Sequence, residues 1–400
     1  MTTVTITELP VDTFTHFQWL LLGLYELERA GEIQLRFHIN AIDRLSLLTI
    51  KYKKLAGLSR RLRSKSLKQP RYNLVGEVEA GGKKRTFTVD SKDSPFIFSE
   101  TLLEQCDAYF KLQCPKEISE RGFPIMPGVY LPWMDVNFGV NEGENAIFAR
   151  KIARQVVPLR DKIHPAMVGP RRLTWTCRYE FLKRGYDNYL LSRQVVKDKT
   201  LTAYFGDAQG GEPSQNVTSY DMDWEWDLIA YLTRFHSNHP NEKRAQAVRL
   251  INTLGDGYDG RLINDIVDGK PVHHSEWVVP LPNFCNFVAR HRYNMNISGF
   301  RLSIPNRFIE SFISGTAIIT DKLALKWYAP FEDGEVVETV EMGYLGNTDV
   351  DWNKFRNDLQ QLPPTDPERI ISAYERKWSP TAFARYVVRT TLNSPSSTER

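Results

Sequence analysis

The stretch that decides the fold is YNMNISGFRLSIPNRFIESFISGTAIITD, from Tyr293 to Asp321. Its first residues, 293–297, alternate bulky and polar side chains like a short strand, and a Ser-Gly pair ends that strand. Pro305 suits the first turn of a helix, where a missing N–H costs little. The following phenylalanines and isoleucines share one helical face, and a glycine ends the helix. The apolar run 317–319 is typical of a buried strand, so the stretch predicts a parallel βαβ unit.

Two charged residues near the start of the predicted helix indicate a binding function. Arg307 and Glu310 are three residues apart and therefore share one helical face. A helix start attracts phosphate, an arginine adds a bidentate fork, and a carboxylate one turn further on accepts hydrogen bonds from vicinal sugar hydroxyls. The pair therefore suits a nucleoside diphosphate. The alternative is a surface ion pair on an amphipathic helix.

A longer pattern surrounds this charged pair. Its members are Ser298-Gly299, Arg301, Arg307-Phe308-Ile309-Glu310, Ser314-Gly315-Thr316-Ala317 and 318–321. The pattern resembles the donor-binding motif in the C-terminal half of GT-B glycosyltransferases, in an exostosin-like form, over roughly thirty of the 400 residues. The resemblance implies that Glu310 holds the ribose of a nucleotide sugar. It also implies that Arg307 or Arg301 and the backbone near Gly299 face the diphosphate. Asn306 is a further candidate donor-binding residue.

A glycine-rich turn is expected earlier in the same half of the chain. The predicted strand 201–205 runs into Gly206-Asp207-Ala208-Gln209-Gly210-Gly211, where backbone N–H groups can approach phosphate. Gly206 and Gln209 therefore join the candidate donor-binding residues. The chain lacks both the G-x-G-x-x-G fingerprint and a P-loop lysine. A dinucleotide-dependent oxidoreductase is accordingly the disfavoured alternative.

The start of the chain predicts a second functional region. A strand at 4–9, a helix at 17–28 and a strand at 33–39 form a β–loop–α–β opening, whose ligand side is the carboxyl end of the strands. Asp12 and His16, in the first loop, are the candidate catalytic bases for an acceptor hydroxyl. The alternatives are that Asp12 or Thr13 caps the following helix and that His16 packs against its start.

Composition limits the possible partners. The chain has 400 residues, is 42% hydrophobic and carries a net charge of +4, so it is globular and nucleic acid is not expected as its main partner. Basic residues gather at 51–71, which predicts a solvated loop or a contact with an anionic membrane surface. No export signal, C-x-x-C pair or run of about 18 apolar residues is present. A cytoplasmic location is expected, with any membrane contact peripheral and at the inner face.

Several pairs of acidic residues and of histidines are candidate metal ligands. The segments 221–223 and 349–351 have the D-x-D spelling, but neither ends a buried apolar strand, and the second is expected to cap a helix. The histidines at 236–239 and 273–274 lack further ligands at a zinc spacing. Asp90 and Asp93 follow a predicted strand; one interpretation is that they face the cleft, and the favoured one is ordinary turn chemistry. No metal and no cofactor is therefore expected.

Together these patterns predict an α/β chain of the GT-B type, with two Rossmann-like doubly wound domains facing across a cleft. Residues 1–195 would form an acceptor-binding domain, 196–365 a nucleotide-sugar-binding domain, and 366–400 a helical tail that packs back on the first domain. The expected function is metal-independent transfer of a sugar from a nucleotide-diphosphate sugar to a glycan or other hydroxyl acceptor, as in bacterial-type polysaccharide or glycoconjugate synthesis. The alternative is a non-catalytic nucleotide- or sugar-binding protein of the same fold.

Overall fold

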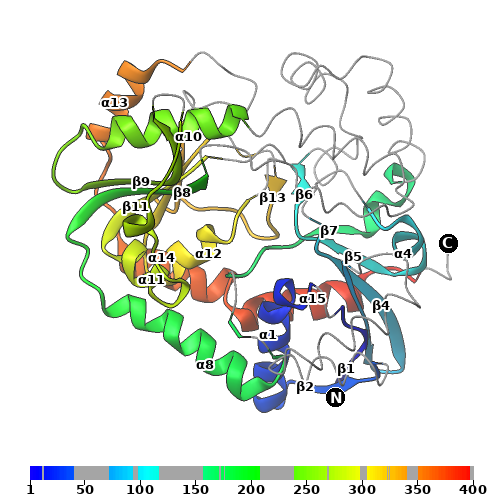
Figure 1. Cartoon of the computed structure of the whole chain (residues 1–400). Helices are drawn as coiled ribbons and strands as arrows, with labels where there is room; N and C mark the ends of the chain where they lie inside the picture. The colour runs from blue at the N-terminus through cyan, green and yellow to red at the C-terminus, as the bar shows by residue number, and fades with distance from the viewer. Residues whose placement is uncertain are drawn as a thin grey trace, which may run out of the picture.

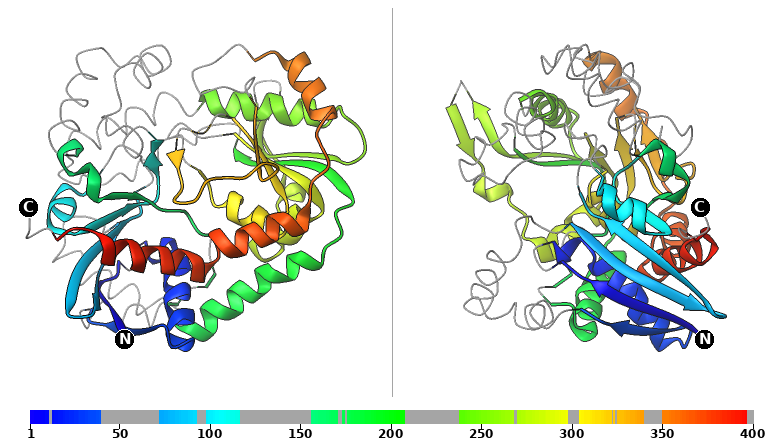
Figure 2. Two further views of the ribbon diagram at one scale, coloured as in Figure 1. Left: turned by 180° about the vertical axis from the view of Figure 1, so that it is seen from behind. Right: turned by 90° about the vertical axis from the view of Figure 1, so that its right-hand side faces the viewer.

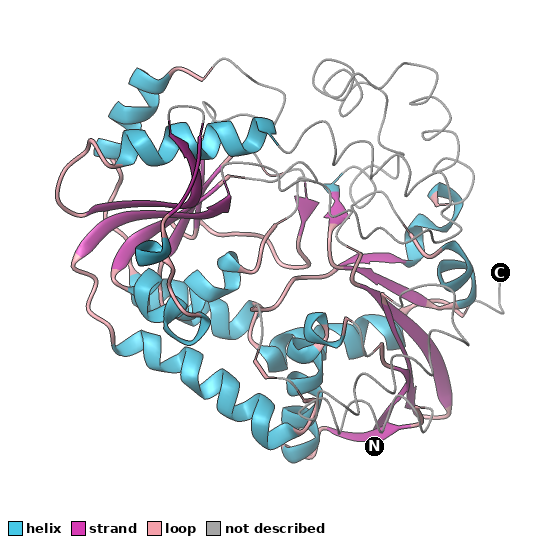
Figure 3. Cartoon of the chain, viewed as in Figure 1, coloured by secondary structure: helices cyan, strands magenta, loops and turns pink. Residues whose placement is uncertain are grey.

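The computed structural model describes residues 1–10, 13–39, 72–92, 98–116, 156–170, 173–174, 176–207, 238–267, 270–297, 304–321, 323, 325–339 and 350–396. Within these ranges the chain is an α/β protein with two six-stranded sheets, each accompanied by helices (Figure 1). Figure 3 shows the two sheets as separate groups of strands. Both sheets mix parallel and antiparallel strands.

The first sheet has the strand order β2-β1-β3-β4-β5-β7. Its strands are β1 (Thr2–Glu8), β2 (Ile33–Phe37), β3 (Asn73–Ala80), β4 (Lys83–Asp90), β5 (Ala108–Lys111) and β7 (Ile163–Pro165). β1 and β2 are parallel and are connected through α1 (Gln18–Arg29), which confirms the predicted β–loop–α–β opening. Gly81 and Gly82 join β3 to β4 with φ values of 57° and 78°. A two-residue turn of this kind requires antiparallel neighbours, and β3 runs antiparallel to both β4 and β1.

The second sheet has the strand order β10-β9-β8-β11-β12-β14. Its strands are β8 (Lys199–Asp207), β9 (Tyr258–Val267), β10 (Lys270–His273), β11 (His291–Asn296), β12 (Ala317–Thr320) and β14 (Val336–Glu338). All of them run parallel except the edge strand β10. The helix α12 (Arg307–Ile313) connects β11 to β12, so the predicted parallel βαβ unit is confirmed. Gly315 ends this helix with a φ of 72°, a conformation that favours glycine.

The remaining helices cover the sheets and connect them. They are α4 (Glu100–Gln105), α8 (Tyr179–Leu190), α10 (Asn238–Ile251), α11 (Leu281–Ala289), α13 (Trp352–Gln360), α14 (Pro367–Lys377) and α15 (Pro380–Asn393). In Figure 2, α14 and α15 run end to end from the second sheet to the first. α15 packs on α1, where a Cβ added to Gly23 would lie 1.9 Å from the carbonyl oxygen of Pro380. Within the described residues, no helix combines the length and apolar character needed to cross a membrane.

A buried aromatic junction joins the two halves. The ring of Trp378, between α14 and α15, stacks on Phe312 of α12 with centroids 4.8 Å apart. The indole Nε1 of Trp19, on α1, donates to the Trp378 carbonyl oxygen at 2.9 Å. A small antiparallel pair, β6 (Cys114–Pro115) with β13 (Leu325–Lys326), makes a second connection. The elements around the first sheet therefore contact α12 of the second through fixed, buried groups.

Candidate functional site

The strand order of the second sheet reverses at β8. From β8 the chain passes to β9 on one side, and it later returns to place β11 on the other side. In open α/β sheets, ligands bind outside the carboxyl ends of the strands at such a point, because the connections leave in opposite directions there. The carboxyl ends of β8 and β11 are therefore the candidate site.

Arg307 reaches this edge from the first turn of α12. Its Nη1 donates to the carbonyl oxygens of Tyr204 and Met295, at 3.3 and 3.4 Å, near the ends of β8 and β11. Its guanidinium carbon lies 5.1 Å from the centroid of the Phe205 ring. The arginine singled out in the sequence therefore lies at the strand ends, where a ligand is expected.

A second arginine, which the sequence analysis missed, contacts the same ring. Arg244 of α10 donates through Nη2 to the Ile297 carbonyl oxygen at 2.8 Å, and its guanidinium carbon lies 5.4 Å from the Phe205 centroid. Nothing in its local sequence distinguishes Arg244 from the other basic residues of its helix. Two guanidinium groups, from α10 and α12, thus gather at the ends of β8 and β11.

Further polar groups continue along the same edge. Asn296, the last residue of β11, donates through Nδ2 to Oγ1 of Thr320 at 3.0 Å, and that hydroxyl donates to Oδ1 of Asp321 at 3.1 Å. Lys243 of α10 is buried, which lowers the pKa of its ammonium, while the Asp321 carboxylate acts in the opposite direction. A chain of hydrogen-bonding groups therefore links the ends of β11 and β12 beside the two arginines.

Glu310 shares a helix with Arg307 but is placed differently. Glu310 is only 1% exposed to solvent, whereas Arg307 is partly exposed. Such enclosure is incompatible with the alternative of a surface ion pair. The carboxylate of Glu310 is therefore closed to solvent in this structure.

The other predicted donor-binding residues are distributed as follows. Gly206 lies inside β8, which extends to Asp207, so the prediction that the turn begins at Gly206 is wrong; pairing with β9 continues the strand past the glycine. Asn306 is the N-cap of α12, but its side chain accepts no capping hydrogen bond. Gln209, Gly299 and Arg301 lie outside the described residues.

The candidate catalytic bases lie in the first half of the chain. His16 is exposed and closes a 3-10 turn, Phe14–His16, directly before α1. This exposure does not favour the alternative in which His16 packs against the helix start. Asp12 lies outside the described residues, and the N-caps of the turn and of α1 are Thr13 and Phe17.

Of the aspartates considered as turn or metal residues, Asp90 and Asp351 lie within the described residues. Asp351 caps α13 by accepting from the N–H groups of Asn353 and Lys354, as expected. Asp90 accepts from the N–H of Lys92 at 2.8 Å, which is turn chemistry, but it is also fully buried and ion-paired. Asp93, the segments 51–71 and 221–223, and His236 lie outside the described residues. In the part of the chain that the structure describes, no group of three or more His, Cys, Asp or Glu is placed to hold a metal.

The partner of Asp90 is a buried lysine that the sequence analysis missed. Lys111 Nζ, at the end of β5, lies 3.3 Å from Oδ2 of Asp90, and the Tyr109 hydroxyl donates to the same oxygen at 2.5 Å. Burial lowers the pKa of Lys111 and raises that of Tyr109 well above its usual value. Asp90 and Lys111 join the ends of β4 and β5, and because both are completely enclosed they cannot meet a ligand directly.

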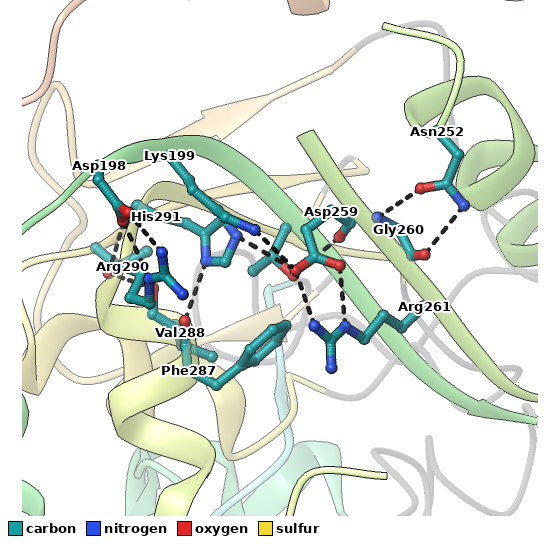
Figure 4. Close-up of polar contacts among 12 residues, drawn as sticks. Asp198, Lys199, Asn252, Asp259, Gly260, Arg261, Phe287, Val288, Arg290 and His291 are labelled. Carbon is teal, nitrogen blue, oxygen red and sulfur yellow. Dashed lines mark hydrogen bonds and ion pairs between the residues drawn. The ribbon is translucent and has the colours of Figure 1, made fainter. Parts of the chain in front are cut away.

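A different polar network occupies the amino ends of β8 and β11 (Figure 4). Asp259 of β9 accepts from Nε of Arg261 at 2.9 Å and pairs with Lys199 Nζ at 3.4 Å. His291, the first residue of β11, donates through Nδ1 to the Phe287 carbonyl oxygen at 3.0 Å. Since Lys199 begins β8 and His291 begins β11, this network lies at the opposite end of the strands from Arg307. We therefore assign it a structural role.

The buried His291 makes stability depend on pH. Burial lowers the pKa of its imidazole to about 4, whereas an unfolded histidine titrates near 6.5. As the pH falls from 6.5 to 4, the unfolded chain gains a proton that the folded chain does not, so stability is lost. His291→Asn, which keeps an N–H donor, should reduce this loss by roughly 1 kcal/mol per pH unit in that window. Urea unfolding at several pH values measures it; parallel curves for the two proteins would contradict the assignment.

Comparison with known proteins does not assign the chain to a family. No protein-family model matches the chain, and no curated protein matches it either. The contacts at the carboxyl ends of β8 and β11 are therefore the basis on which a function is inferred.

Proposed function

We propose that the protein is a glycosyltransferase of the GT-B type, which binds the diphosphate of a nucleotide sugar at the carboxyl ends of β8 and β11. The observation that carries the proposal is the pair Arg244 and Arg307, which contact one ring, Phe205, at the point where the strand order reverses. Guanidinium groups bind phosphate oxygens through two parallel hydrogen bonds, and two of them match the two phosphates of a diphosphate.

The same groups would supply the electrostatic part of the reaction. Negative charge develops on the diphosphate as it leaves the sugar, and cations already in place stabilise that charge more strongly than water does. Arg244 and Arg307 are held by the carbonyl oxygens of Ile297, Tyr204 and Met295, so little reorganisation is needed. In this proposal the transfer needs no metal, and His16 or Asp12 takes the proton of the acceptor hydroxyl.

The proposal assigns different partners to the two halves. Residues 1–195 would bind the acceptor, a glycan or another hydroxyl compound, and 196–365 the nucleotide sugar, across a cleft between them. The tail 366–400 would hold the two together; α15 packs on α1 and Trp378 on Phe312. The protein would act in the cytoplasm, with 51–71 contacting the inner face of the membrane.

The enclosure of Glu310 favours a second candidate function. A donor site of the GT-B type needs a carboxylate that reaches the ribose, whereas Glu310 is 1% exposed. A non-catalytic protein that binds a phosphorylated nucleotide or sugar through Arg244 and Arg307 needs no such contact. This candidate predicts binding without turnover.

A thermal-shift series tests the proposed function. ADP, GDP, UDP and their common sugar conjugates are added to the full chain, with inorganic phosphate as the control. Binding stabilises the folded state by RT ln(1 + [L]/Kd), or about 2.7 kcal/mol at a hundredfold excess over Kd, so the preferred nucleotide gives the largest rise in Tm. Release of the nucleoside diphosphate from the preferred conjugate then separates transfer from binding. A Tm that no compound raises above the phosphate control would refute both functions.

A further inference from the structure

One glutamine of the first half is bonded at both ends of its amide to the backbone beside the candidate site. Gln113 follows β5 and is 4% exposed. Its Nε2 donates to the Ile304 carbonyl oxygen at 3.2 Å, and the Ile304 N–H donates to its Oε1 at 3.1 Å. A buried amide satisfied in this way holds the backbone at a fixed distance and angle, because breaking either bond leaves a polar group enclosed without water.

Ile304 is close to Arg307 along a stiff part of the chain. Pro305 follows it and has a restricted φ, and the N–H of Phe308 donates to the Pro305 carbonyl oxygen at 3.2 Å, which forms the first turn around Arg307. Ile304 is itself fully buried. Few free torsions therefore separate the backbone that Gln113 holds from the Cα of Arg307.

The segment that carries Gln113 is also held in place. Cys114, the next residue, begins β6, which pairs with β13 in the register Cys114 with Lys326 and Pro115 with Leu325. Gln113 thus lies between β5 of the first sheet and a strand pair made with the second half. The start of α12 is therefore held by contacts with the segment that follows the first sheet, as well as by contacts within its own sheet.

We propose that Gln113 is a positioning residue for the diphosphate site, acting through the backbone of Ile304 on the guanidinium of Arg307. This inference rests on the proposed function, because it concerns the ligand that Arg307 binds. With this role, the contact that Gln113 makes between the two halves of the chain sets the affinity for the diphosphate.

The chain offers a matched control. Gln18 of α1 is 1% exposed and makes the same two-point contact with backbone, donating to the Thr174 carbonyl oxygen at 2.6 Å and accepting from the Leu173 N–H at 3.0 Å. Its partners lie in the first half and do not adjoin Arg307. Loss of either amide should lower stability by a similar amount. A difference in ligand affinity between the two variants is therefore due to the position of Arg307 and not to a general loss of stability.

The test compares Gln113→Met with Gln18→Met. Titration calorimetry at 25 °C measures the Kd for UDP, GDP, ADP and inorganic pyrophosphate, and thermal unfolding measures Tm. We expect both variants to lose Tm and only Gln113→Met to bind the preferred probe more weakly, by about tenfold. Gln113→Leu serves as a second variant: it removes both bonds to the Ile304 backbone without adding charge, and should also bind more weakly.

A double-mutant cycle shows whether the effect passes through Arg307. In an Arg307→Ala background, Gln113→Met should cause no further loss of affinity, because the group that it positions is gone. Equal losses in both backgrounds, or an unchanged Kd in both Gln113 variants, would overturn the positioning role and leave the proposed function intact. A wild-type protein that binds none of the four probes would overturn the proposed function itself, and the role of Gln113 with it.

Discussion

Replacing Arg307 with alanine is expected to reduce turnover by about 10²- to 10³-fold, the usual loss when a preplaced charge-stabilising donor is removed from an active site. Arg244→Ala should act in the same direction, because both guanidinium groups lie about 5 Å from the Phe205 ring. Arg307→Lys should recover only part of the loss, since an ammonium keeps the charge but lacks the fork. Steady-state kinetics with the nucleotide sugar found by thermal shift measures all three variants.

A control for these variants lies on the same helix as Arg244. Arg249 of α10 pairs with Asp265 at 3.1 Å and is exposed to solvent, and Arg249→Ala should leave kcat/KM within about twofold of wild type. Melting temperatures identify variants that have lost their fold. The assignment fails if Arg307→Ala loses activity only in proportion to folded protein, or if Arg249→Ala is equally impaired.

Replacing Lys111 with methionine is expected to destabilise the protein by about 3–5 kcal/mol, the typical cost of leaving a buried charge without its partner. Asp90 would retain its bonds from the Tyr109 hydroxyl and the Lys92 N–H, but it would lose the ammonium that lies 3.3 Å from its carboxylate. Urea unfolding at pH 7 measures the loss. Adding Asp90→Asn to the lysine variant should restore more than half of it, because the uncompensated charge is then removed.

An exposed ion pair gives the comparison for this second prediction. Lys183 and Asp187 form an i,i+4 pair on α8 whose side chains are 36% and 49% exposed, so Lys183→Met should change stability by less than about 1 kcal/mol. A Lys111→Met variant no less stable than Lys183→Met would contradict this prediction. In that case the two polar bonds to Asp90 would be sufficient for its burial.

Several features were predictable because their causes are local. Pro305 and Gly315 mark the two ends of α12, and the apolar residues between them have helical spacing. Asp351 caps α13 through the N–H groups of its own first turn, and Pro380 separates two helices of the tail. Each of these depends on residues a few positions apart, so the pattern of the chain is sufficient.

Other features depended on how distant segments meet. Arg244 and Arg307 come together because α10 and α12 border neighbouring strands, and no spacing in the sequence records which strands are neighbours. The same holds for Lys111 beside Asp90 and for Gln113 beside Ile304.

The sequence by itself therefore determined the secondary structure around the candidate site and one of its two arginines. The tertiary structure decided the strand order, the second arginine and the enclosure of Glu310. The physical reason is that backbone propensity and hydrophobic periodicity act over a few residues, whereas burial and the pairing of charges are set by side chains that only folding brings into contact.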